Sequence, residues 1–147
     1  NLVATVEKSI EPLQQLIKNK SITIHIESKD KVNAYYDEDR IVQVVTNLLS
    51  NAIKFCPEID GLITIQIKEK NNFIHTFVQD NGKGINPNDF DAIFEKFYQS
   101  TNQNIKKPVG SGLGLAICKQ IIEHHKGNIW TEKAMNGANI SFTLQIE

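Results

Sequence analysis

The sequence has few of the features that mark specialised classes of protein. No apolar run approaches the length of a membrane span, and no signal-peptide pattern stands at the N-terminus. Its two cysteines, Cys56 and Cys118, share no metal-ligand spacing, which favours a reduced structural pair. The formal net charge is only −1, so the chain lacks the positive patch of a protein that binds nucleic acid or anionic membranes. We therefore expect a cytoplasmic domain with no nucleic-acid partner and no direct membrane contact.

The size and ordinary composition of the chain indicate one folded domain. With 147 residues, 40% of them hydrophobic, it is large enough to bury a core, so we expect residues 1–147 to form a single unit. The chain begins at Asn1 and its only methionine is Met135, which suggests a piece of a longer protein. Whether that parent is anchored in a membrane, and whether this piece is oligomeric, stays open.

Hydrophobic periodicity predicts the order of the secondary-structure elements. Helical spacing is found over residues 2–17, 37–57 and 112–125, with a kink expected at Pro12, an N-cap at Asp37 and a C-cap at Gly127. Alternating apolar residues predict strands over 22–26, 63–67, 73–78, 128–132 and 140–146. This order predicts an α+β fold in which a mixed or antiparallel sheet has its helices on one face.

The segment between residues 81 and 110 is irregular and rich in Gly, Asn, Pro and Lys. Its only helical pattern is brief, around residues 90–98. A segment of this length without regular structure is usually a functional loop in a compact domain.

A polar stripe runs along the predicted helix over residues 37–57. Asn47, Asn51 and Lys54 are spaced by four and three residues, so they project from one side of the helix. An amide oxygen is a hard neutral ligand that suits Mg²⁺, and a lysine neutralises phosphate. Taken alone, the stripe favours a solvated helix surface. That interpretation is weakened because Asn is unfavourable inside a helix and two Asn residues stand at contact spacing.

Two glycine-rich segments carry further candidates. Asp80 ends a hydrophobic strand and is followed by Gly82 and Gly84, so its carboxylate can accept a hydrogen bond from an exocyclic amine such as that of adenine. Residues 110–115 open the last predicted helix, where unpaired amides favour an anion such as phosphate. Taken alone, the first segment favours an ordinary Asp-rich turn, whereas the position of the second at a helix start favours phosphate binding over a flexible glycine turn.

The order of these motifs resembles the N, G1, F and G2 boxes of sensor histidine kinases. The matching segments are residues 47–55, 80–85, 94–97 and 112–115, so the resemblance covers nearly the whole chain. It implies a catalytic ATP-binding domain with the Bergerat fold, which gyrase, Hsp90 and MutL share. That fold is a two-layer α/β sandwich in which a mixed sheet of about five strands carries three main helices on one face. The resemblance also implies an ATP lid over about residues 86–109.

The resemblance implies a role for each matching residue. Asn51 would be the Mg²⁺ ligand, while Asn47 and Lys54 would be the catalytic residues that place the metal and the phosphates. Asp80 would recognise adenine, and Phe94 would pair with Phe97 in packing the lid and contacting a dimerisation domain. The further residues implied to contact ATP are Phe55, Gly82, Gly84, Ile85, Phe97, Gly110, Ser111, Gly112, Leu113, Gly114 and Leu115.

The implied activity is transfer of the γ-phosphoryl group of MgATP to a histidine in two-component signalling. None of the four histidines has the neighbours of the family's phosphoacceptor motif, so the acceptor would lie on a separate dimerisation domain, upstream of a response regulator. An ATPase of the gyrase, Hsp90 or MutL kind needs a carboxylate where Asn47 stands. This fold supports two further functions. One is serine kinase activity of the anti-sigma-factor type, and the other is partner binding by a degenerate domain without catalysis.

Overall fold

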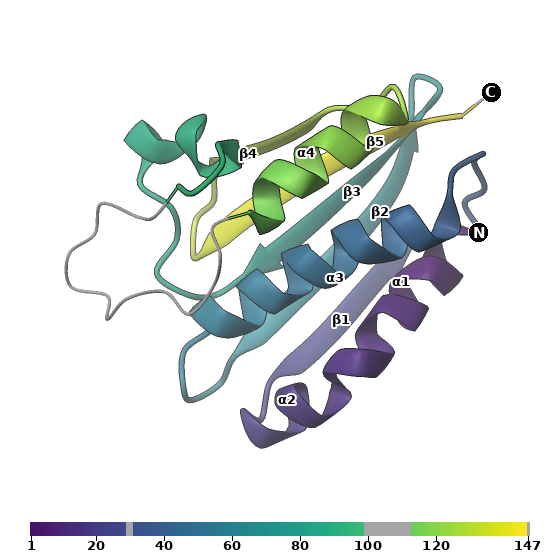
Figure 1. The fold of residues 1–147 in the computed structure, drawn as a ribbon. Coiled ribbons are helices and arrows are strands. Elements are labelled where there is room, and N and C mark those ends of the chain that lie inside the picture. The colour runs from purple at the N-terminus through teal and green to yellow at the C-terminus, as the bar shows by residue number, and fades with distance from the viewer. Residues whose placement is uncertain (29–30, 99–112, 147) are drawn as a thin grey trace.

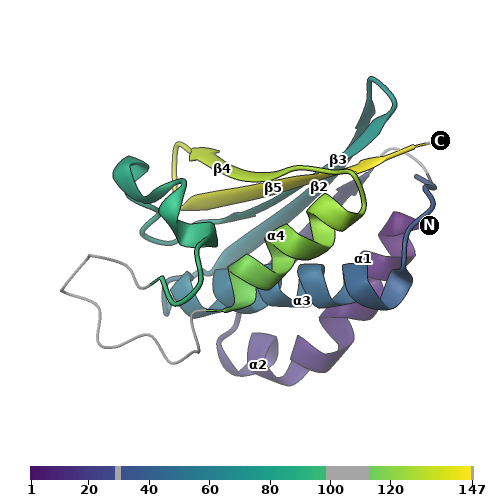
Figure 2. The same ribbon diagram turned by 45° about the horizontal axis from the view of Figure 1, so that its top comes forward.

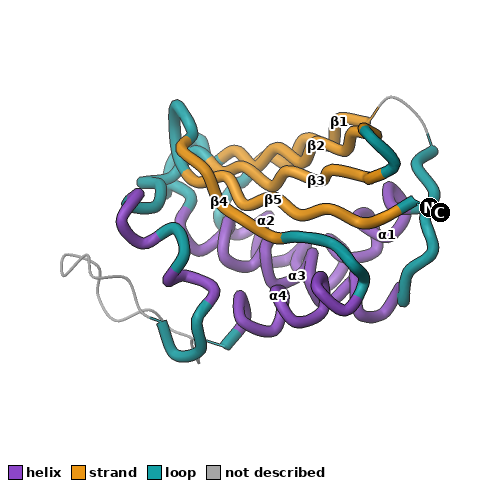
Figure 3. Tube along the Cα trace, turned by 90° about the horizontal axis from the view of Figure 1, so that it is seen from above, coloured by secondary structure: helices purple, strands orange, loops and turns teal. Residues whose placement is uncertain are grey.

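The chain folds into a five-stranded sheet with its helices on one face (Figures 1 and 3). The computed structural model describes residues 1–28, 31–98 and 113–146. The helices and strands are, in chain order, α1 (Leu2–Ile10), α2 (Gln14–Asn19), β1 (Thr23–Ser28), α3 (Glu38–Phe55), β2 (Leu62–Lys70), β3 (Phe73–Asp80), α4 (Gly114–His124), β4 (Ile129–Lys133) and β5 (Ala138–Gln145). Within these described ranges, no helix is both long and apolar enough to cross a membrane.

The sheet is mixed, as the sequence predicts. Its strand order is β1-β2-β3-β5-β4, with β1 parallel to β2 and every other neighbouring pair antiparallel. The β2–β3 hairpin turns at Asn71 and Asn72, which both adopt positive φ values. The α+β class and the two layers are therefore confirmed.

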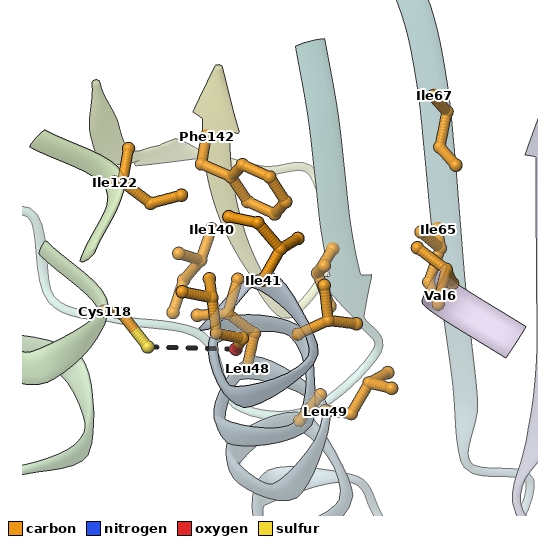
Figure 4. Close-up of a cluster of buried hydrophobic side chains, with 14 of the residues drawn as sticks. Val6, Ile41, Leu48, Leu49, Ile65, Ile67, Cys118, Ile122, Ile140 and Phe142 are labelled. Atoms are coloured by element: carbon orange, nitrogen blue, oxygen red, sulfur yellow. Dashed lines mark hydrogen bonds between the residues drawn. The ribbon is translucent and has the colours of Figure 1, made fainter. Parts of the chain in front are cut away.

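Helix α3 is the centre of the helical layer. It lies between α1 and α4, and it packs its apolar face on β3 (Figures 1 and 2). That face carries Ile41, Val44, Val45, Leu48, Leu49, Ala52 and Ile53, all buried. Figure 4 shows Ile41 and Leu48 of this face grouped with Ile140 and Phe142 of β5, within the core that joins the two layers. The 3.6-residue period thus fixes which side of α3 is left for polar residues.

Two local predictions differ from the structure. The segment over residues 2–17 is not one kinked helix, because a 3-10 turn (Glu11–Leu13) that contains Pro12 separates α1 from α2. Gly127 is not the left-handed residue after α4, since Lys126 takes that conformation with φ of 57°. Gly127 is required for another reason: a Cβ there would overlap the carbonyl oxygen of Thr143.

The described part of the predicted lid contains two short 3-10 turns, Pro87–Asp89 and Ala92–Phe94. The second of these corresponds to the brief helical pattern in the sequence. Residues 99–109 of the predicted lid lie outside the described residues.

The N-cap of α3 gives a direct test of how the central helix is held. Asp37 accepts a hydrogen bond from the Arg40 backbone N–H at 3.2 Å. Replacing Asp37 by Ala removes this acceptor, so we expect the free energy of unfolding to fall by about 1 kcal/mol. Urea unfolding followed by circular dichroism measures the change. Asp39→Ala, in the first turn of the same helix, is the matched control, and an equal loss in both variants would contradict the capping role.

Candidate functional site

The polar stripe of α3 borders its buried face. Asn47, Asn51 and Lys54 are each half-buried, whereas the neighbouring Ser50 is exposed. The helix therefore holds the two amides and the ammonium group along one side, as their spacing predicts. The Nζ atom of Lys54 lies 5.5 Å from the centroid of the Phe55 ring.

One end of the stripe meets the start of α4. The Asn47 side-chain amide donates to the Gly114 carbonyl oxygen at 3.5 Å, and a Cβ at Gly114 would lie 3.8 Å from Asn47 Cγ. One turn further along, the Cys118 thiol donates to the Val44 carbonyl oxygen at 3.8 Å (Figure 4). The structure thus brings together two motifs that are more than sixty residues apart in the sequence.

The thiol of Cys118 belongs to the packing between α3 and α4. The side chain is completely buried, and burial raises its pKa to about 11. A thiol with this pKa is protonated at neutral pH and is a poor nucleophile. This agrees with the structural role predicted for the cysteines.

Asp80 lies near the other end of the stripe and is only 5% exposed. Its Oδ1 atom accepts hydrogen bonds from the Gly82 N–H at 2.8 Å and the Ala138 N–H at 3.3 Å. Burial raises the pKa of this carboxyl, and the two backbone hydrogen bonds oppose the shift. Both bonds go to Oδ1, and the structure shows none from a described residue to Oδ2. That second oxygen can therefore accept a hydrogen bond from a ligand.

Glycines allow the backbone to pack closely around Asp80. A Cβ on Gly82 would overlap the Phe55 carbonyl oxygen at the end of α3, and a Cβ on Gly137 would overlap the Asp80 carbonyl oxygen. Gly84 has φ of 80°, a conformation that favours glycine. The turn between β4 and β5 therefore presses against the end of β3. The contact made by Ala138 was not predicted, because a main-chain donor leaves no signal in the residue type.

The other residues predicted to contact the ligand differ in how far they are buried. Ile85 and Leu115 pack, partly buried, against the core, and Leu113 is the N-cap residue of α4. Phe55 is 39% exposed. Phe94 and Phe97 do not behave as a matched pair, since Phe94 is buried and Phe97 is 71% exposed. Gly110, Ser111 and Gly112 were also predicted to contact the ligand, and they lie outside the described residues.

The donor set limits how a metal could be held. Within the described ranges, no group of three or more His, Cys, Asp or Glu residues could hold a metal ion. A cation at this site would take one amide oxygen from the stripe and its remaining ligands from water and phosphate. This is the coordination that Mg²⁺ accepts, so the residues present fit a magnesium–phosphate complex.

Asp80 and the polar stripe of α3 thus offer complementary chemistry. Asp80 is a buried acceptor for an amine-bearing ring, while the stripe, which reaches the start of α4 at Asn47, carries amide and ammonium groups for an anion. Together with the mixed sheet, this arrangement defines a nucleotide-binding α+β domain.

Comparison with known proteins assigns the family. The chain belongs to the family described as "Histidine kinase-, DNA gyrase B-, and HSP90-like ATPase", which matches residues 36–147. It is 39% identical over 111 residues to the sensor histidine kinase WalK of Bacillus subtilis, an alignment that covers 74% of this chain and 18% of WalK. The chain therefore spans a small part of this relative.

Solved structures agree with this assignment. The nucleotide-free catalytic domain of histidine kinase ThkA has a TM-score of 0.85 at 30% identity, with 99% of this chain and 92% of that chain covered. Histidine kinase ThkA in complex with the response regulator TrrA has a TM-score of 0.84 at 28% identity, with 100% of this chain and 41% of that chain covered. The fold is that of a histidine kinase catalytic domain, and the ATP-binding class follows from the family.

The raised pKa of Asp80 predicts how stability depends on pH in the nucleotide-free domain. The pKa of Asp80 is higher in the folded state than in the unfolded state. The protonated carboxyl therefore contributes its full stability to the folded wild type below pH 3.8, and this contribution is lost as the pH rises through the raised pKa. Asp80→Asn keeps an oxygen for both backbone N–H groups but cannot ionise. We expect its unfolding free energy to exceed that of the wild type at neutral pH, by a margin that shrinks toward pH 3.8.

Urea unfolding at a series of pH values measures this margin. The exposed residue Asp91 provides the matched control variant, Asp91→Asn, which should show no comparable gain at neutral pH. A margin that grows toward acid would show that burial does not dominate the Asp80 environment.

Proposed function

We propose that the domain binds MgATP and supplies the γ-phosphoryl group to a histidine on a separate dimerisation and phosphoacceptor domain. The observation that carries the proposal is the buried Asp80 carboxylate, whose Oδ2 remains available as an acceptor near one end of the α3 polar stripe. The other end of that stripe meets the start of α4. A nucleotide has the matching polarity, with an amine on its base and negative charge on its phosphates.

We assign recognition of the base to Asp80 and to the backbone around it. Its Oδ2 accepts from the exocyclic amine of adenine, while Gly82, Gly84 and Ile85 shape the wall of the pocket. Phe55 supplies a partly exposed ring beside the ribose and base. The carbonyl that guanine carries in place of this amine cannot donate, so the acceptor selects adenine.

We assign the phosphates and the metal to the polar stripe of α3. Asn51 is the protein ligand of Mg²⁺, Asn47 helps to place the metal and the phosphates, and Lys54 contacts a phosphate. Gly114 and Leu115, with Leu113 and the preceding glycine segment, bring the start of α4 to the phosphates. When bound, Mg²⁺ supplies neutralisation of the charge on the phosphate oxygens. Asn47 and Lys54 orient the same oxygens for in-line attack.

The transfer step needs little covalent chemistry from this domain. The bond between the γ-phosphorus and the bridging oxygen of ADP breaks, and a bond from that phosphorus to a histidine nitrogen forms. ADP leaves with the bridging oxygen. The contribution of the chain is positioning and charge neutralisation, which is consistent with Asn rather than a carboxylate at position 47.

The partners follow from the same proposal. A dimerisation domain presents the acceptor histidine, and Phe97, with its exposed ring, forms part of the surface that receives this domain. A response regulator takes the phosphoryl group downstream, in keeping with the ThkA–TrrA complex. We place the domain in the cytoplasm, where ATP is available.

Two competing functions are an ATPase and a serine kinase of the anti-sigma-factor type with the same fold. An ATPase needs a general base for water, and the stripe offers amides and an ammonium group instead. A serine kinase uses the same nucleotide site, so only the acceptor distinguishes it.

Two substitutions separate base recognition from metal binding. Asp80→Asn removes a charged acceptor, and losing a hydrogen bond of this kind reduces the binding free energy by roughly 1.5–3 kcal/mol. The affinity for ADP should therefore fall about 10- to 100-fold, with or without Mg²⁺. Asn51→Ala should weaken binding only when Mg²⁺ is present. Calorimetry under both conditions tests this, and Asp91→Asn serves as the control. Equal loss from Asn51→Ala without metal would remove its assignment as the Mg²⁺ ligand.

The activity itself is tested with radiolabelled ATP and three samples: this domain, the dimerisation domain of its own parent protein, and their mixture. We expect acid-labile label on the dimerisation domain in the mixture only, since high concentration replaces the missing covalent linkage. Label on this domain itself would refute the division of roles. Label on serine would favour the anti-sigma-factor type, and ATP hydrolysis without a phosphoprotein would favour the ATPase.

A further inference from the structure

Asn81, the residue after Asp80, joins two segments of the chain through its side chain. Its Oδ1 accepts from the Leu62 N–H at 2.8 Å, and its Nδ2 donates to the Asp60 carbonyl oxygen at 2.8 Å. Its own N–H donates to the Leu62 carbonyl oxygen at 3.2 Å. The carboxamide therefore bonds as donor to the loop between α3 and β2 and as acceptor to Leu62, the first residue of β2.

That loop leads directly out of the end of α3. Cys56 is the C-cap residue of the helix, and its thiol lies 3.9 Å from the same Asn81 Oδ1 atom. The Asp60 backbone has φ of 58°, which an Asp adopts only at some strain, so the bond to its carbonyl helps to hold an unfavourable conformation. Asn81 thus fixes the path of the chain between α3 and β2.

The same contacts bear on Asp80. Gly82 follows Asn81, donates its N–H to Asp80 Oδ1, and approaches the Phe55 carbonyl so closely that no Cβ fits. If the loop moves away from Asn81, the end of α3 and Gly82 lose their fixed separation. The carboxylate then loses one of the two donors that orient it.

We propose that Asn81 is a positioning residue that sets the orientation of the Asp80 carboxylate by tying the loop after α3 to the end of β3. The part that concerns adenine rests on the function proposed above. Asn81 acts through Asp80 and Gly82 rather than by touching the nucleotide, because both polar atoms of its side chain are already bonded, to Leu62 and Asp60. It also fixes the separation between Asp80 and the polar stripe of α3.

The first test uses the nucleotide-free domain, so it is independent of the proposed function. In Asn81→Ala, amide hydrogen exchange should speed up at Leu62, which loses its acceptor, and at Gly82, whose bond to Asp80 loosens. Asn72→Ala is the matched control. Asn72 also donates from its side chain to a backbone carbonyl, that of Ile146, at the far end of the same hairpin. It should lower stability without changing exchange at Leu62 or Gly82.

The second test is a double-mutant cycle with Asp80→Asn, read as ADP affinity by calorimetry. Asn81→Ala should weaken binding roughly five- to tenfold, from the loss of two hydrogen bonds, while Asn72→Ala should leave affinity unchanged. Because Asn81 acts through Asp80, its effect should largely disappear in the Asp80→Asn background. If Asn81→Ala does not fold, Asn81→Asp carries the same comparison, since it keeps the acceptor for Leu62 and loses the donor to Asp60.

Each outcome decides the inference. Accelerated exchange at both amides, with coupled effects on affinity, supports it. Wild-type exchange at Gly82 overturns it, and so do additive effects in the cycle, which would mean that Asn81 contacts the nucleotide independently. If the wild type binds no adenine nucleotide, the proposed function fails, and exchange at Gly82 alone then decides whether Asn81 positions Asp80.

Discussion

The structure around the site depends on how the buried carboxylate of Asp80 is compensated. A carboxylate removed from water is unfavourable unless hydrogen bonds replace its hydration. Here the replacement comes from two backbone N–H groups, on Gly82 and Ala138, that reach one oxygen from different parts of the chain. To supply them, the segment after β3 must approach the end of α3, and the β4–β5 turn must approach the end of β3. Both approaches are possible only because Gly82 and Gly137 lack a Cβ.

Helix α3 carries this local arrangement across the domain. Its apolar face anchors it to the sheet, and its polar stripe extends from near Asp80 to the start of α4. This one helix therefore fixes the distance between the Asp80 carboxylate, an acceptor for a base, and the polar groups of the stripe, which suit phosphates. A catalytic domain that works by positioning needs such a fixed spacing more than it needs a reactive side chain. The protonated thiol of Cys118 fits this view, since it contributes packing between α3 and α4.

Most of the fold could be predicted from the sequence because its signals are local. The period of α3, the cap at Asp37 and the alternation in β2 and β3 each follow from neighbouring residues. The errors arose where distant contacts decide. Gly127 was expected to end α4, yet its missing Cβ serves contact with Thr143 of β5, and Lys126 adopts the left-handed conformation instead. The donor at Ala138 could not be predicted, because every residue type except proline carries the same N–H.

The stripe and the two glycine-rich segments are each too common to indicate a function alone. Only their order along the chain made the family resemblance specific. The structure adds a physical reason for that order. Asn47 contacts Gly114, and Phe55 abuts Gly82, so each glycine-rich segment packs against a different part of the same helix. A change in the length or pitch of α3 would shift both contacts together, so the spacing of the stripe constrains both glycine-rich segments.

Phe94 and Phe97 belong to one motif but lie in different environments. The Phe94 ring is buried in the core, and the Phe97 ring is exposed. This domain has no acceptor histidine motif of its own, and an exposed aromatic ring on its surface is a group that a partner can bury on binding.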